Sequence, residues 1–249
     1  MKKQLIALLF AVLPVASFAA GGSGYPLEHF EPNVADQASL QDGLKTYMNY
    51  CMGCHATKFQ RYERVADDLG VPHDLFNENI IFNGAKIGSL MENSMRAEES
   101  KRWFGATPPD LTLVARVRGA DWLYTYLRTF YVDPKRPWGV NNKVFPDVGM
   151  PHVLAELQGL QVDNCAGQDA SERDTLTGEK LCGFELVKTG SMNPAEYDQA
   201  VYNLVNFLVY SAEPMQLERE RIGYWVLLFL LVLLIPAYLL KKEYWKDVH

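Results

Sequence analysis

The segment Cys51–His55, with the sequence Cys-Met-Gly-Cys-His, constrains this chain more than any other part of it. In an exported protein, the pattern Cys-x-x-Cys-His is typical of covalent attachment of a c-type haem. Two thiols at this spacing can add to the two vinyl groups of one porphyrin, and the adjacent histidine then lies beneath the iron as an axial ligand. The sequence contains this motif once, so we expect one haem c, held by Cys51, Cys54 and His55.

Two other kinds of site use a Cys-x-x-Cys pair and remain alternatives. A thioredoxin-like redox pair follows a strand and precedes a helix. Here the motif ends a predicted helix that starts at a capping-box variant, Ser39–Asp42, because apolar residues recur at three- and four-residue steps through residues 40–51. Structural zinc usually needs two paired half-sites, and the sequence has one. A haem stain after denaturing electrophoresis would identify a haem-free thiol or zinc module.

The N-terminus has the composition of a secretory signal peptide. Lys2 and Lys3 precede a short apolar stretch, and small residues follow near Ala19. The apolar stretch is shorter than the roughly 20 residues that span a bilayer, although retention as an anchor remains the alternative. We expect residues 1–19 to be removed, with Ala20 as the other candidate cut site, and the remaining chain to be exported.

A second apolar run, residues 223–240, contains no charge and meets the length criterion for a transmembrane helix. Lys241 and Lys242 follow it, so the excess of positive charge predicts a cytoplasmic C-terminus. A buried core helix is the alternative. We therefore expect a periplasmic cytochrome domain over residues 20–221, an anchor helix over 222–240 and a short cytoplasmic tail over 241–249.

The second iron ligand should come from a methionine or a spare histidine. Met150 lies between Gly149 and Pro151, in a predicted loop that restrains the backbone and leaves the thioether free to point inward. His152 is the main competitor. Met48, Met91, Met95 and Met192 fit the usual role of methionine as core filler.

The remaining cysteines, Cys165 and Cys182, flank a polar segment. In an oxidising compartment the simplest interpretation is a disulfide, which would stabilise the fold by roughly 3 kcal/mol, and two free thiols are the alternative.

Three more helical segments are expected: one from near Asp110, one over Asp121–Phe130, and one that starts with Asn193 as its N-cap and stops before Pro214. Apolar residues at helical spacing predict one core-facing side for each of the last two helices: Trp122, Leu123, Tyr126, Leu127 and Phe130 in the first, and Tyr197, Val201, Leu204, Val205 and Leu208 in the second. Strand signals are weak. The net charge of −6 argues against a nucleic-acid partner. Acidic residues at Asp67, Asp68, Glu92, Glu98 and Glu99 fit either a solvated face or a docking surface for a basic redox protein.

These features together resemble the cytochrome c1 family in its proteobacterial form, over essentially the whole mature chain. The matching segments are Cys51–His55, Trp103–Leu111, Val114–Arg118, Gly149–Pro151 and Ala212–Pro214, in this order between a signal peptide and a C-terminal anchor. The resemblance implies a mainly α-helical, class I c-type cytochrome-like haem domain with long loop insertions and one transmembrane helix. It also implies Met150 as the sixth ligand, Arg118 near a haem propionate and Pro109 against the ring.

The resemblance further implies a function and partners. The family is the haem-bearing subunit of the ubiquinol–cytochrome c reductase (cytochrome bc1) complex, which is dimeric and contains cytochrome b. We therefore expect an electron carrier rather than an enzyme on its own, on the periplasmic side of the inner membrane and in contact with lipid. It would take electrons from the Rieske iron–sulfur protein and pass them to a periplasmic c-type cytochrome. A tethered c-type cytochrome that serves a terminal oxidase or another reductase is the alternative.

Overall fold

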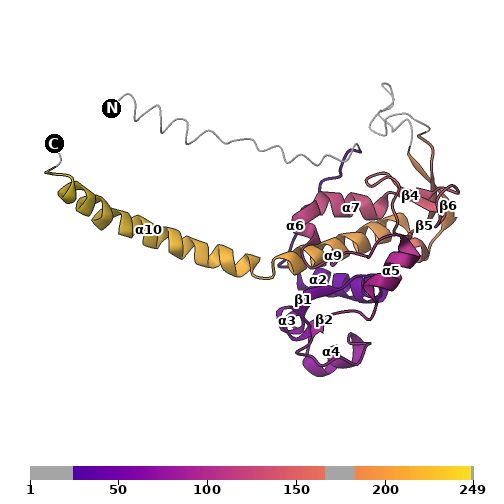
Figure 1. Ribbon diagram of the computed structural model, residues 1–249, viewed down its shortest axis with the longest axis horizontal. Coiled ribbons are helices and arrows are strands. Elements are labelled where there is room, and N and C mark those ends of the chain that lie inside the picture. Colours follow the sequence, from indigo (N-terminus) through magenta and orange to yellow (C-terminus); the bar gives the residue numbers. More distant parts are fainter. Residues whose placement is uncertain (1–24, 166–182, 248–249) are drawn as a thin grey trace.

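The computed structural model describes residues 25–165 and 183–247, so the predicted signal peptide and Cys182 lie outside the described residues. The described chain is a mainly α-helical domain from which one long helix, α10, departs (Figure 1). This arrangement confirms the predicted fold class of a helical domain with long loops and one C-terminal apolar helix.

The centre of the domain is the crossing of α2 (Gln37–Thr46) and α9 (Pro194–Ala212). A Cβ atom at Gly43 would lie 2.0 Å from the carbonyl oxygen of Asn203, so only glycine allows the two backbones to approach this closely. Beside this contact, the hydroxyl of Ser39 donates a buried hydrogen bond of 2.8 Å to the Asn203 amide oxygen. The crossing therefore combines close backbone packing with satisfied polar groups.

Helix α9 begins and ends as predicted. The Asn193 side chain accepts the backbone N–H of Glu196, whose carboxylate accepts the N–H of Asn193, and the helix ends at Ala212 before Pro214. The predicted apolar face is buried along its whole length, which places it in the core. Its members are Tyr197, Val201, Leu204, Val205 and Leu208.

The predicted start of the first helix, with Ser39 as its N-cap, is wrong by three residues. Helix α2 begins at Gln37, and Asp36 is the N-cap, because its carboxylate accepts the backbone N–H of Ser39 at 3.1 Å. Ser39 is instead the third helical residue. One π-helical turn, η1 (Tyr47–Cys51), continues α2 to the first cysteine of the motif, so the motif does end a helix.

Five short helices follow η1 along the chain, between residues 62 and 128. They are α3 (Tyr62–Asp68), α4 (His73–Asn79), α5 (Ala97–Phe104), α6 (Val114–Arg118) and α7 (Ala120–Arg128).

The predicted start of α6 near Asp110 is early by four residues. The Asp110 carboxylate accepts the backbone N–H groups of Lys58 and Thr112, and this bonding holds a loop rather than a helical turn. The helix predicted over Asp121–Phe130 is shorter in the structure. Helix α7 ends at Arg128, two residues before the predicted end, because Phe130 begins a strand.

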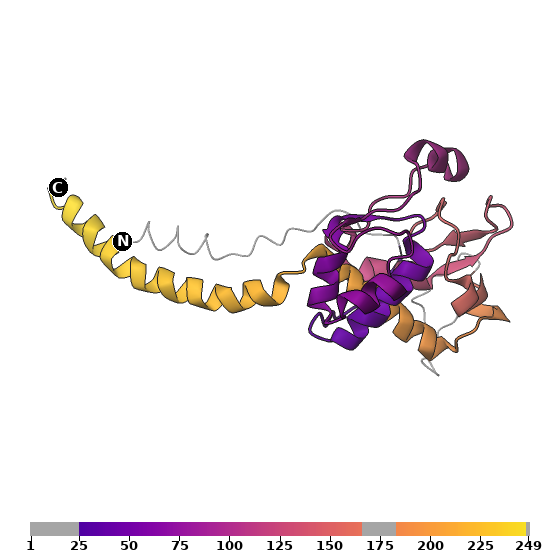
Figure 2. The ribbon, with the colours of Figure 1, turned by 90° about the horizontal axis from the view of Figure 1, so that it is seen from below.

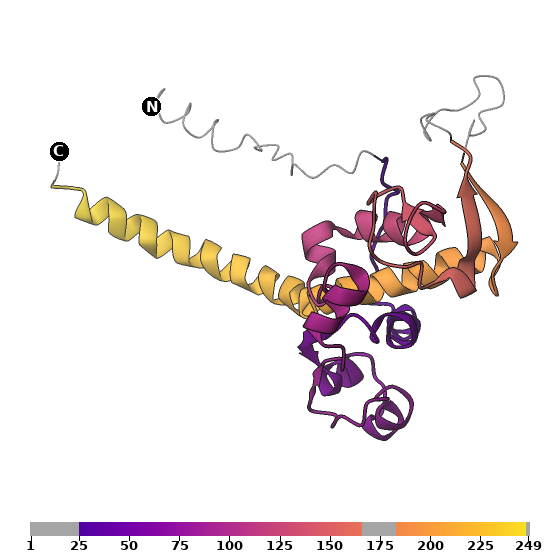
Figure 3. The same ribbon diagram turned by 45° about the vertical axis from the view of Figure 1, so that its right-hand side comes forward.

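Three antiparallel strand pairs, which the sequence analysis did not predict, complete the domain. β1 (Thr57–Arg61) pairs with β2 (Leu90–Met91), and β3 (Phe130–Val132) pairs with β4 (Val140–Asn142). β5 (Gly159–Asp163) pairs with β6 (Phe184–Thr189) at the end of the domain far from α10, and short α8 (Ala155–Gln158) precedes β5 (Figure 3). These strands have two to six residues each, too few for a clear alternation of apolar and polar residues.

Helix α10 (Gln216–Tyr244) extends beyond the predicted span at both ends. It curves smoothly away from the domain and continues through Pro236 (Figure 2). Among the described residues it is the one helix that is long and apolar enough to cross a membrane, with a mean hydropathy of 2.4, and its apolar window is not buried in the domain.

Candidate functional site

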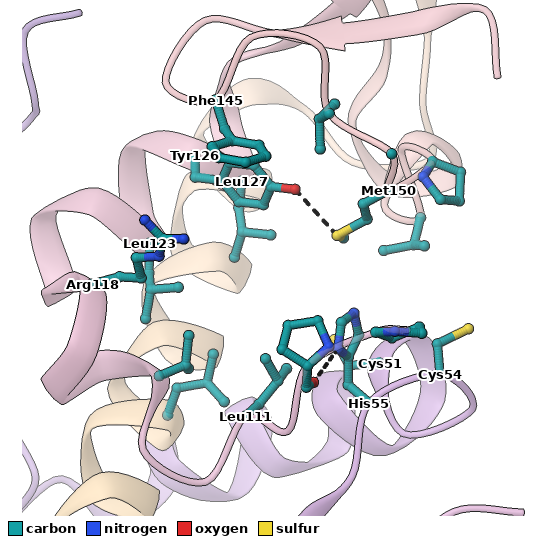
Figure 4. A pocket seen from close by; sticks show the side chains of 18 of the residues that line it. Cys51, Cys54, His55, Leu111, Arg118, Leu123, Tyr126, Leu127, Phe145 and Met150 are labelled. Atoms are coloured by element: carbon teal, nitrogen blue, oxygen red, sulfur yellow. Dashed lines mark hydrogen bonds between the residues drawn. The ribbon is translucent and has the colours of Figure 1, made fainter. Parts of the chain in front are cut away.

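An apolar cavity of about 340 Å³ lies between the Cys51–His55 motif on one side and the Met150 loop on the other (Figure 4). The proximal wall, as we call the first side, follows η1, and the distal wall is the loop after β4. Helices α6, α7 and α9 close the space between the two walls. Cys51, Cys54, His55, Pro109, Arg118 and Met150 all line it.

The two motif cysteines lie on the proximal wall because the chain turns back on itself after η1. The backbone N–H groups of Cys54 and His55 both donate to the carbonyl of Cys51, at 3.0 and 2.8 Å. Neither thiol forms a disulfide, and burial raises the pKa of the Cys51 thiol to about 12. The structure thus brings two thiols and one imidazole to the same side of one cavity.

His55 is held in the tautomer that a metal ligand needs. Its Nδ1 lies 2.7 Å from the carbonyl oxygen of Pro109, which can only accept, so Nδ1 carries the proton and Nε2 keeps a free lone pair. Burial lowers the pKa of the imidazole and favours this neutral form. The hydroxyl of Tyr47 donates to the backbone carbonyl of His55 at 2.7 Å and stabilises the turn that carries this histidine.

Met150 lies on the distal wall with its sulfur toward the cavity, opposite His55 (Figure 4). The hydroxyl of Tyr126 on α7 donates to the Met150 sulfur at 3.3 Å. Burial raises the pKa of Tyr126, so its hydroxyl keeps the proton that it donates. A Cβ atom at Gly149 would lie 3.2 Å from the carbonyl oxygen of Phe104, so the loop packs closely on the end of α5.

One arginine, Arg136, stabilises the loop that carries Met150. Arg136 donates to the side chain and to the backbone carbonyl of Asp147 at 2.9 and 2.7 Å. Asp147 has a positive φ of 62°, which is unusual for a residue other than glycine. These contacts hold the chain three residues before Met150 in one conformation.

His152, the competing ligand, lies outside the cavity lining. Its ring stacks on Phe130, with 4.9 Å between the ring centroids and 4° between the planes. Burial lowers its pKa to about 4, so the ring is a neutral part of the core. This placement supports Met150 as the sixth ligand.

Arg118 and Pro109 both lie at the cavity, but in different roles. The Arg118 guanidinium is 5.2 Å from the ring centre of Trp122 and 5.8 Å from that of Phe145, and among the described residues it has no carboxylate partner. It is therefore available to a carboxylate of a bound group. Pro109 lines the cavity and also supplies the carbonyl that orients His55.

The sequence analysis missed how much of the cavity comes from residues that it assigned to helical core faces. Tyr126 is the clearest case, because it contributes both apolar surface and the hydrogen bond to Met150. The others are Trp122, Leu123, Leu127, Leu204 and Leu208. The helical spacing that predicted their burial contained the signal, but it cannot distinguish packing on a cofactor from packing on protein.

The structure leaves two other predictions untested: the disulfide between Cys165 and Cys182, and the acidic docking surface. Cys165 is buried, but Cys182 lies outside the described residues, so their pairing stays a prediction. The acidic residues lie on separate elements. Asp67 bonds to His73 at 2.8 Å, and Asp68 accepts from Arg64 and from the Tyr210 hydroxyl, so this pair is largely engaged within the domain.

The side chains fit a covalently attached haem. Two thiols and a histidine nitrogen lie on one wall, a thioether lies opposite, and the space between them is bounded almost entirely by apolar atoms. In the described part of the chain, no group of three or more histidine, cysteine or carboxylate side chains is arranged to hold a metal ion on its own. The same residues therefore give no support to the zinc alternative.

Comparison with known proteins decides the family. The model of the Cytochrome C1 family matches residues 85–248, more than half of the chain. The chain belongs to the cytochrome c1 family. Members carry covalently bound haem c and act as membrane-bound electron-transfer subunits of the cytochrome bc1 complex.

Individual relatives cover both the motif and the anchor. The chain is 51% identical to cytochrome c1 of Allochromatium vinosum over the whole length of both proteins. It is 24% identical to cytochrome c1 of Rhodobacter capsulatus, over 98% of this chain and 97% of that one. A Nitrosomonas europaea protein named ammonia monooxygenase gamma subunit is 43% identical, over 99% of this chain and all of that one.

Proposed function

We propose that this family member takes single electrons from the Rieske iron–sulfur protein and passes them to a periplasmic c-type cytochrome during ubiquinol oxidation. The observation that carries the proposal is the placement of His55 and Met150 on opposite walls of one apolar cavity, with the two motif thiols on the wall of His55. Histidine and methionine together are the axial pair typical of c-type electron carriers, and they favour a high potential.

Each site residue has a defined task in this proposal. Cys51 and Cys54 would hold the porphyrin through two thioether bonds, and Nε2 of His55 and the sulfur of Met150 would bind the iron. When bound, haem iron supplies a centre that gains and loses one electron without breaking a substrate bond. The chain therefore needs no acid or base of its own, and the reductase reaction belongs to the complex.

The protein's contribution to electron transfer is a rigid and dry surrounding. The Pro109 carbonyl orients His55, the Tyr126 hydroxyl orients Met150, and Arg136 braces the distal loop. Ligands that keep one geometry in both oxidation states minimise the structural change that each electron must drive. Arg118 would neutralise a haem propionate, and Pro109 would pack against the ring.

The charges at the end of the anchor support an orientation. Lys241 and Lys242 lie in the last turn of α10, so the positive-inside rule favours a cytoplasmic C-terminus and a periplasmic haem domain, with residues 1–19 as a removed signal peptide. We propose cytochrome b as the neighbouring subunit within a dimeric complex. A relative from Bradyrhizobium diazoefficiens named cytochrome b/c1, 25% identical over 86% of this chain, supports that pairing.

Purification from native membranes in a mild detergent tests the proposal. We expect the chain to retain a haem stain after denaturing electrophoresis and to co-purify with cytochrome b and an iron–sulfur protein. Ubiquinol should reduce its haem in the intact complex, and removal of the iron–sulfur subunit should abolish that reduction. Rapid reduction without the iron–sulfur subunit would refute the proposed donor, and purification with a terminal oxidase instead would favour the alternative carrier.

A further inference from the structure

Three exposed apolar side chains and three basic ones form a surface that the proposed electron transfer does not use. Phe59 on β1, Leu113 before α6 and Val117 on α6 are 69, 49 and 76% exposed. Lys58, Arg61 and Arg116 are exposed beside them on the same two segments. We call these six residues the membrane-facing patch.

Two buried hydrogen bonds connect this patch to the end of α9. The side-chain amide of Gln60 donates to the carbonyl of Ser211 at 2.8 Å, and the Ser211 hydroxyl donates to the carbonyl of Thr112 at 3.2 Å. The backbone N–H of Phe59 donates to the Thr112 hydroxyl at 3.3 Å, which joins β1 to the segment before α6. Figures 1 and 3 both show β1 and α6 beside the point where α9 passes into α10.

The length of the connection to the anchor places this face near a bilayer. Helix α9 ends at Ala212, α10 begins at Gln216, and the uncharged run starts at Gly223. The intervening helical residues rise about 1.5 Å each, so the end of the domain lies about 10 Å from the start of the hydrocarbon span. The headgroup layer on each side of a bilayer is about 5–8 Å thick, so an exposed side chain at this face can reach it.

The charges on the patch match a lipid surface. Among the described residues, Lys58, Arg61 and Arg116 have no carboxylate within ion-pair distance, although the chain as a whole carries a net charge of −6. The nearby Asp110 carboxylate is occupied by backbone N–H groups. Exposed apolar side chains flanked by unpaired cations are typical of surfaces that bind anionic headgroups and insert into the layer above the acyl chains.

We propose that the membrane-facing patch inserts into the headgroup layer of the leaflet at which α10 begins, and that its occupant is an anionic phospholipid surface. The anchor alone fixes the domain at one point and leaves it free to tilt about that point. A second contact by Phe59 and Val117 restricts the tilt and sets the direction in which the haem cavity faces.

The chain offers a matched pair of valines for a test. Val117 lies on the patch, and Val187 on β6 is 57% exposed at the far end of the domain. A nitroxide label is attached at Val117→Cys or Val187→Cys in the full-length, haem-loaded chain, which is placed in bilayer nanodiscs with its haem reduced so that the iron is diamagnetic. Collision rates with oxygen, which concentrates in bilayers, and with a water-soluble nickel chelate report the position of each label.

In nanodiscs containing anionic lipid, we expect the label at position 117 to collide several-fold more with oxygen and several-fold less with the chelate than the label at 187. Equal water accessibility of the two labels would overturn the proposal. Protection at 117 that occurs only in the complete complex, and not with the chain alone in nanodiscs, would overturn it in favour of a protein partner. Exchange of anionic for zwitterionic lipid should reduce the protection, and an unchanged value would overturn the assignment of an anionic surface.

Discussion

The hydrogen bond from Tyr126 to the Met150 sulfur should raise the redox potential of the haem. A donated hydrogen bond draws electron density from the sulfur. The sulfur then donates less electron density to the iron, which stabilises the oxidised iron less. A buried hydrogen bond contributes about 0.5–1.5 kcal/mol. For one electron, 1.4 kcal/mol corresponds to 59 mV, so Tyr126→Phe should lower the midpoint potential by up to about 20–60 mV. The full value applies if the bond acts in the reduced state alone.

The rest of the Tyr126 environment should survive this substitution. The ring stacks on Trp122 with centroids 4.7 Å apart and packs edge-on against Phe130 at 5.1 Å, and phenylalanine retains both contacts. The hydroxyl is therefore the only group removed.

Potentiometric titration of the full-length protein, followed by absorbance, measures the effect. Tyr124→Phe is the matched control, because Tyr124 lies on the same helix but contacts Phe30 at 5.4 Å and Arg128 at 4.6 Å, away from Met150. An unchanged potential in Tyr126→Phe, or a shift equal to that of the control, would refute the reasoning. So would an increase in potential, because it reverses the expected direction.

Three further predictions concern the sixth ligand, the helix crossing and the cap of α9. Met150→Leu should keep the covalent haem but lower the potential far more than Tyr126→Phe, whereas Met192→Leu, outside the cavity lining, should not; a titration of both checks this. Gly43→Ala places a Cβ against the Asn203 carbonyl and should lower the free energy of unfolding by about 1–3 kcal/mol or more in a denaturant titration. Asn193→Ala removes the N-cap of α9 and should cost about 1 kcal/mol by the same method.

Local rules predicted the parts of the structure whose cause is local. The capping box at Asn193 and Glu196 fixes the start of α9, and its apolar spacing fixes the buried face. The start of α2 was wrong because Asp36 and Ser39 are both good N-cap residues three positions apart, and spacing alone does not choose between them. The extra turn comes from the bond between Asp36 and the Ser39 N–H.

The site shows where local reasoning stops. The motif and the setting of Met150 indicated candidate ligands, but the bond between His55 and Pro109 joins residues 54 positions apart, and that between Tyr126 and Met150 joins residues 24 apart. No spacing rule connects such pairs. The strands were missed for a related reason, since β1 and β2 depend on pairing across a segment that contains α3 and α4 rather than on their own composition.

Helix α9 links the redox site to the membrane. Leu204 and Leu208 line the cavity, and Ser211, less than one turn further, bonds to the segments that carry the membrane-facing patch. Only the residues 213–215 separate this helix from the anchor. Because the cavity and the patch are both joined to α9, a tilt of the domain against the bilayer must move the haem with it. If the membrane-facing patch contacts lipid as proposed, that contact sets the distance from the haem to any partner fixed in the membrane.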